Sequence, residues 1–120
     1  MRYIHTTIQV RDLKKSLAFY QDLLGLAVVR GTTEGRGPVF LGEADKPVIE
    51  LIAGGTGGEA AFGGVSVGFE VDSLEEATRK LEAAGCPRIR GPISPNPQLA
   101  FSFFRDPDGM EIQLLEYLRP

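Results

Sequence analysis

Two residues of this chain have side chains that could carry chemistry, and both stand in unusual places. His5 is the single histidine, and an imidazole can move protons or bind a metal near neutral pH. Glu50 shares one side of an extended stretch with Val48 and Ile52, so its carboxylate interrupts an apolar face. Since a buried carboxylate without a partner is costly, we expect a cation, a hydrogen-bond donor or water beside Glu50. The simpler interpretations are a solvated edge-strand carboxylate and a hydrogen-bonded strand histidine.

Hydrophobic patterning predicts the elements that hold these residues. In the first half, alternation predicts a strand over residues 4–10 with His5 on its polar side. Asp12 is a predicted N-cap, apolar residues follow at helical spacing, and Gly25 is placed to end the helix. Extended stretches are then predicted over residues 26–30, 39–41 and 48–52.

The second half repeats this order of elements. Alternation predicts a strand over residues 65–71, and Ser73 with Glu76 forms a capping-box pattern before a helix that Gly85 ends. Asp106-Pro107-Asp108-Gly109 predicts a tight turn near the C-terminal end. The predicted extended stretches are residues 88–90, 98–105 and 110–117, and the proline-rich segment 91–97 is predicted to be a lid or rim of rigid outline.

The repeated order predicts a tandem duplication within one domain. A shift of 61 residues aligns His5 with Ser66, and a slightly larger shift aligns Glu50 with Gln113. The predicted repeats are residues 1–53 and 65–118, joined by a glycine-rich linker over 54–64. We therefore expect a single α+β domain of two βαβββ modules; the alternative is a chance similarity between two amphipathic βα units.

Composition sets the class of protein and excludes several others. The 120 residues are 42% hydrophobic and 24% charged, as in an ordinary globular domain. A net charge of −3 and the lack of a basic block argue against nucleic acid as a partner. A single cysteine, Cys86, excludes an internal disulfide and favours a reducing, cytoplasmic setting. No apolar stretch is long enough to predict a membrane partner.

Several motifs together resemble the vicinal oxygen chelate superfamily, which includes glyoxalase I, extradiol dioxygenases and bleomycin-resistance proteins. The resemblance rests on the opening strand and helix (residues 4–26), the Val48-Ile49-Glu50-Leu51 strand, the segment 68–72, and the turn 106–109 with the strand after it. It covers essentially the whole chain. What it implies is a fold of paired βαβββ modules whose mixed sheets curl around a cleft.

The resemblance also implies a metal-ligand set. Metal-dependent members take two ligands from each module, which correspond here to His5, Glu50, Ser66 and Gln113. His5 and Glu50 match the usual pattern, whereas Ser66 stands where histidine is usual and Gln113 where glutamate is usual. The implied cofactor is a divalent metal (Zn, Ni, Fe or Mn) held by His5, Glu50 and Gln113, with Ser66 at the fourth position. Such an ion would be a Lewis acid toward substrate oxygens, while Glu50 or a bound water moves the proton.

Two classes of function are consistent with these residues. The first is an enzyme of the lyase, isomerase or dioxygenase type with catalytic His5 and Glu50. Its small oxygen-bearing substrate would contact Arg105, Phe103 and Ser66. For Arg105, the simpler interpretation is a solvated arginine beside Asp106 and Asp108.

The second class is a metal-free protein that sequesters a drug or metabolite. Such a protein needs a hydrophobic cleft and few polar anchors. The candidate walls are Phe40, Phe62, Phe101, Phe103, Phe104 and Tyr117. A third alternative is an inactive paralogue or accessory domain that binds a regulatory metabolite. In each case we expect a homodimer, because two modules leave sheet edges that must be covered.

Overall fold

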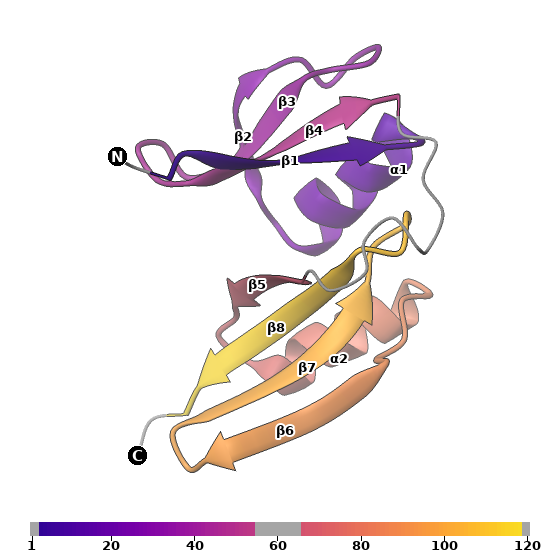
Figure 1. Ribbon diagram of the computed structural model, residues 1–120. Helices are drawn as coiled ribbons and strands as arrows, with labels where there is room; N and C mark the ends of the chain where they lie inside the picture. Colours follow the sequence, from indigo (N-terminus) through magenta and orange to yellow (C-terminus); the bar gives the residue numbers. More distant parts are fainter. Residues whose placement is uncertain (1–2, 55–65, 119–120) are drawn as a thin grey trace. The chain divides into compact units, whose positions relative to one another are not determined.

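The computed structural model describes residues 3–54 and 66–118. The chain divides into two compact units, Met1–Gly58 and Glu59–Pro120. The elements of the first unit are β1 (His5–Val10), α1 (Leu13–Leu17), η1 (Ala18–Leu23), β2 (Ala27–Gly31), β3 (Val39–Gly42) and β4 (Val48–Ala53). Those of the second unit are β5 (Ser66–Glu70), α2 (Leu74–Ala83), β6 (Arg90–Asn96), β7 (Leu99–Arg105) and β8 (Glu111–Tyr117) (Figure 1).

Each unit contains one open, four-stranded mixed sheet, and both sheets have the same topology. The strand orders are β1-β4-β3-β2 and β5-β8-β7-β6. In each sheet the first and last strands of the unit pair in parallel, and the other neighbours pair antiparallel. The predicted α+β class and the βαβββ order are therefore confirmed. The resemblance implied curled sheets, whereas these two sheets are open and uncurled.

One face of each sheet packs against the helix of its own unit. In the first unit this face buries Ile8, Leu41 and Leu51 completely, together with Tyr20 of η1. In the second unit Phe104, Ile112 and Leu114 are buried in the same way under α2 (Figure 1). Alternation along the strands sends the intervening residues to the other side of each sheet, which we call the helix-free face. The chemistry-bearing residues lie on that face.

The predicted helix caps are present in both units. The Asp12 carboxylate accepts a hydrogen bond from the Lys15 amide at 3.2 Å, and the Ser73 hydroxyl accepts one from the Glu76 amide at 3.2 Å. The first helix changes to a π-helix over Ala18–Leu23, which the sequence pattern did not predict. The wider turn accompanies the burial of two consecutive aromatic residues, Phe19 and Tyr20.

Residues 91–97 lie largely in a strand that the sequence pattern did not predict, and their role as a lid or rim stays a prediction. The segment is most of the edge strand β6 and pairs with β7, with register irregularities on either side of Ile93. Prolines are tolerated there because an edge strand needs only one of its two sides for ladder hydrogen bonds.

The organisation of the two repeats as a single domain stays a prediction. Its glycine-rich join at 54–64 lies outside the described residues except for Gly54. Among the residues described, no helix is long and apolar enough to cross a membrane.

Candidate functional site

Strand register brings the key residues of the first unit together on its helix-free face. Thr7 of β1 lies opposite Glu50 of β4, and Glu50 in turn lies opposite Phe40 of β3. His5 is two residues before Thr7 and therefore on the same side of β1. The Thr7 hydroxyl donates a hydrogen bond of 2.5 Å to Glu50 Oε1. Glu50 thus has the polar partner that its place in an apolar strand predicts.

The His5 imidazole lies beside the same carboxylate oxygen. Its Nε2 is 3.6 Å from Glu50 Oε1, too far for a direct hydrogen bond, and the Glu50 side chain is only 16% exposed. The imidazole also meets the Phe40 ring edge to face, with 6.1 Å between ring centres. Its Nδ1 is buried without a hydrogen-bond partner in the described part of the chain. The site thus combines a half-buried carboxylate with an imidazole for which the described residues provide no direct hydrogen bond.

The spacing of these two side chains fits two ligands of one divalent ion. Donors about 2.1 Å from a zinc-sized ion are separated by at most about 4 Å, and 3.6 Å lies within that span. A ligating histidine usually donates its other N–H to a second partner, which His5 Nδ1 lacks among residues 3–54 and 66–118. Over the same residues, no group of three or more His, Cys, Asp or Glu side chains could hold a metal. The first unit therefore brings together two candidate ligands, His5 and Glu50.

The other two residues of the implied ligand set, Gln113 and Ser66, lie on the helix-free face of the second unit. Gln113 lies opposite Gly68 on β5, the place that corresponds to Thr7 opposite Glu50. A Cβ atom on Gly68 would come within 3.0 Å of Gln113 Oε1, so the glycine makes room for this carboxamide. Ser66 is exposed at the start of β5. Gln113 therefore lacks the hydroxyl donor that Thr7 supplies to Glu50.

An arginine that the sequence reasoning did not select contacts Phe103. The guanidinium of Arg90 lies over the Phe103 ring, with Cζ 4.0 Å from the ring centre, and it forms an ion pair with Glu111. Arg105, the predicted anion binder, is exposed at the end of β7. Repeat alignment would not have identified Arg90, because an offset of 61 residues pairs Arg30 with Gly91. Strand register shows instead that Arg30 occupies the matching place over Phe40, with Cζ 4.1 Å from the ring centre.

The predicted aromatic walls fall into different environments. Phe40, Phe101 and Phe103 lie on helix-free faces, and the last two meet edge to face at 5.7 Å. Phe104 is completely buried in the core, so its assignment as a wall is wrong; strand alternation places it under α2. Tyr117 is exposed. Phe62 lies outside the described residues.

The turn before β8 is structural. Asp106 is buried, and its Oδ1 accepts hydrogen bonds from the backbone amides of Asp108 and Met110 at 2.9 and 2.8 Å. These bonds satisfy amides inside the turn and direct the chain into β8. Asp108 is buried as well, so neither carboxylate is a free surface charge.

Comparison with known proteins relates most of this chain to one sequence family. Residues 2–114 match the sequence model of the Glyoxalase/Bleomycin resistance protein/Dioxygenase superfamily. A lactoylglutathione lyase of Neisseria meningitidis serogroup A is 32% identical over 126 residues, which cover 97% of this chain and 91% of that protein.

Solved structures show the same fold. The trypanothione-dependent glyoxalase I of Leishmania major superimposes with a TM-score of 0.78 at 29% identity, over 97% of this chain and 86% of the other. TnmS3, an antibiotic-binding protein from Streptomyces sp. CB03234, gives a TM-score of 0.72 at 19% identity, over 98% and 97% of the two chains. The second likeness concerns the fold alone.

Proposed function

The chain belongs to the glyoxalase/bleomycin resistance protein/dioxygenase superfamily, and from this premise we propose that it is a lyase- or isomerase-type enzyme acting on a small oxygen-bearing metabolite. The observation that carries the proposal is the half-buried Glu50 carboxylate, held by the Thr7 hydroxyl and flanked by His5. The relatives named lactoylglutathione lyase support the same class of reaction.

In the proposed mechanism, Glu50 moves the proton. The Thr7 hydroxyl binds Oε1 and fixes the orientation of the carboxylate, while Oε2 has no side-chain partner within the described ranges. An unoccupied carboxylate oxygen of fixed orientation can take a proton from a carbon next to a carbonyl and return it to the neighbouring atom. Phe40 forms an apolar wall beside His5.

We propose His5 Nε2 and Glu50 as two ligands of a divalent metal, because the 3.6 Å between Nε2 and Oε1 suits two donors to one ion. Gln113 is proposed as a third, with Ser66 at the fourth position. When bound, such an ion supplies Lewis acidity toward substrate oxygens. Because glutamine and serine are neutral donors, we expect weaker binding than with histidine and glutamate in those positions. The identity of the ion, among zinc, nickel, iron and manganese, is part of the test.

The experiment combines metal analysis with turnover. Tag-free protein purified without chelators is assayed for bound metal, titrated with each ion, and tested on lactoylglutathione and on small carbonyl and diol compounds. We expect Glu50→Gln to lose the metal and to lower turnover by about two to four orders of magnitude. Glu75→Gln is the matched control, because Glu75 is an exposed glutamate of α2 that pairs with Arg79. Retained turnover in Glu50→Gln would remove Glu50 from the mechanism.

A metal-free binding protein is the second candidate. The neutral side chains at Ser66 and Gln113 favour it, and so do the aromatic rings on the helix-free faces. A binding protein needs apolar walls and few charges, so Glu50→Gln should leave its ligand affinity within about twofold of the original value. Undetectable metal uptake together with that result would favour sequestration. For either function, the cytoplasmic setting stays a prediction from the single cysteine.

A further inference from the structure

The helix-free face of the first sheet carries a cation whose charge is not neutralised. Arg30 lies over the Phe40 ring, and His5 meets that ring from its edge. The guanidinium and the imidazole therefore pack against one phenyl group. Within residues 3–54 and 66–118, Arg30 has no carboxylate within ion-pair distance.

In the second unit, the arginine at the corresponding place is neutralised by a carboxylate. Arg90 lies over Phe103 just as Arg30 lies over Phe40, but Arg90 is paired with Glu111. Glu111 is the register partner of Ser66, and the corresponding partner of His5 is Val48. An apolar residue thus replaces the counter-ion in the first unit. An arginine retained over an aromatic ring without its counter-ion is suited to an external anion.

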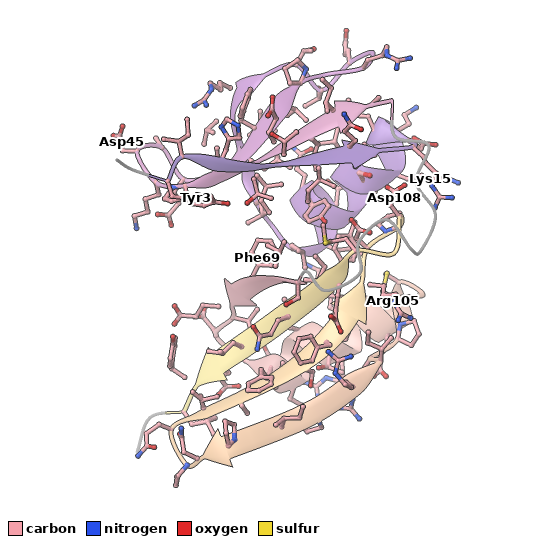
Figure 2. The ribbon with its side chains drawn as sticks, in the orientation of Figure 1. Tyr3, Lys15, Asp45, Phe69, Arg105 and Asp108 are labelled. Carbon is pink, nitrogen blue, oxygen red and sulfur yellow. The ribbon has the colours of Figure 1, made fainter. Side chains whose placement is uncertain are left out.

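A pocket opens beside Arg30 at the start of β1. Its volume is about 370 Å³, within the usual size range for sites that bind small molecules. Arg30 and Lys46 contribute positive charge, Asp45 contributes negative charge, and Tyr3, Ile4 and Val48 provide apolar or aromatic surface. Figure 2 shows Tyr3 and Asp45 at the same end of the first unit.

The charged groups of this pocket are not equally available. Lys46 already binds Glu43, with 2.8 Å between Nζ and Oε2, so much of its charge is balanced locally. The Asp45 carboxylate opposes an anion placed near it but can accept a hydrogen bond from a ligand hydroxyl. Arg30 is the group left to bind an anion, and its planar fork matches a carboxylate.

We propose that this pocket binds the carboxylate of a small organic acid, with Arg30 as the main contact. The apolar lining would hold the carbon skeleton of the acid. Val48, which lines the pocket, is the register partner of His5, so a bound acid extends toward His5 and Glu50. The assignment of this acid as the substrate class rests on the proposed function; binding of the acid itself does not.

The test compares an acid with its neutral isostere. Phenylacetate and phenylacetamide are titrated separately into the ¹⁵N-labelled full chain, and dissociation constants are taken from backbone amide shifts. We expect phenylacetate to bind about tenfold more tightly than phenylacetamide, since a hydrogen bond to a charged group is worth about that factor. Shifts should centre on Arg30, Lys46 and Val48.

Two matched variants test whether Arg30 is the cation that binds the acid. Arg30→Gln should weaken phenylacetate binding about tenfold, whereas Arg90→Gln, which removes the corresponding neutralised arginine, should leave it within about twofold. Amide spectra of both variants report whether the fold is kept, and Arg30→Lys, which keeps the charge without the fork, should bind with intermediate affinity. Equal binding of acid and amide, equal losses in the two glutamine variants, or no saturable shift would overturn the proposal.

The same variants separate this inference from the proposed enzyme function. If Arg30→Gln loses phenylacetate binding while Glu50→Gln retains turnover, the acid pocket stands and the proposed function of Glu50 fails. If Glu50→Gln loses turnover while Arg30→Gln still binds phenylacetate normally, the proposed function stands and the pocket assignment fails.

Discussion

Glu50 shows how a single unusual residue acquires its environment. Its place among apolar residues predicts a partner, and the structure supplies a hydroxyl from Thr7 at 2.5 Å and an imidazole nitrogen at 3.6 Å. Neither partner is close to Glu50 in the sequence. The parallel pairing of β1 with β4 brings them together, and one position of slip would turn Thr7 to the opposite face.

Removing the Thr7 hydroxyl should affect function more than stability. Thr7→Val keeps the branched shape of an exposed strand residue but leaves Glu50 Oε1 without its donor. We expect turnover to fall about tenfold, in line with the worth of a hydrogen bond to a charged group. Thr7→Ser should restore it, and Thr33→Val, at an exposed loop position, should have no effect. Steady-state kinetics of the three variants provide the measurement, and normal kinetics in Thr7→Val would exclude a positioning role.

Cys86 should be a weakly reactive thiol. Partial burial raises its pKa, and the negative charge of Asp106 raises the pKa further. A raised pKa leaves less thiolate at any given pH, so alkylation by iodoacetamide should reach half its maximal rate at a higher pH in the folded chain than in the chain unfolded in urea. The pH midpoint is measured because burial also slows access. Coinciding midpoints would contradict the prediction.

Local sequence rules predicted the helix ends well, because contacts between residues close in the sequence determine where a helix begins and ends. Asp12 and Ser73 cap their helices, and Gly25 and Gly85 follow the helix ends with φ of +76° and +85°. Two predictions failed at this scale. The π-helix at Ala18–Leu23 was missed because six residues are too few to distinguish its period from that of an α-helix. Strand β6 was missed because its prolines are typical of loops, and only pairing with β7 makes the segment a strand.

Glycine at the end of β2 should be required for the approach of β3. Gly31 has a φ of +90°, and a Cβ there would lie 2.2 Å from the Pro38 carbonyl oxygen. Gly25 has a similar φ of +76° but open space around it. We expect Gly25→Ala to cost about 1 kcal/mol of unfolding free energy from backbone strain alone. Gly31→Ala should cost clearly more, about 3 kcal/mol, because backbone must move. Urea denaturation compares the two, and equal losses would show that the close approach is unimportant.

At the scale of the whole molecule, the two units repeat a topology and also a side-chain pattern. Each sheet carries an arginine over a phenylalanine opposite its central glutamate or glutamine. The units differ in chemistry. The first has a Thr7–Glu50 hydrogen bond, and the second has Gly68 beside Gln113. The two units thus share a framework and differ in their polar groups, which is why we assign the proposed proton transfer to the first unit.

The chain should form a homodimer. Within residues 3–54 and 66–118, the outer strands β1, β2, β5 and β6 each have one edge without a strand partner in their own sheet. Exposed edges favour pairing, and two-fold dimers are the commonest soluble assembly. Sedimentation equilibrium over a dilution series should therefore give twice the chain mass of 13.0 kDa. A single-chain mass at every concentration would contradict the prediction.

The sequence by itself determined the order of elements, their caps, the repeat and the candidate pair His5 and Glu50, because these depend on periodicity and on residue type. Tertiary structure decided which side chains meet. The Thr7 hydroxyl binds Glu50, Arg30 lies over Phe40, and Glu111 neutralises Arg90. Strand register produces each of these contacts, and register is set by hydrogen bonds between segments distant in the chain together with the packing of a whole sheet face.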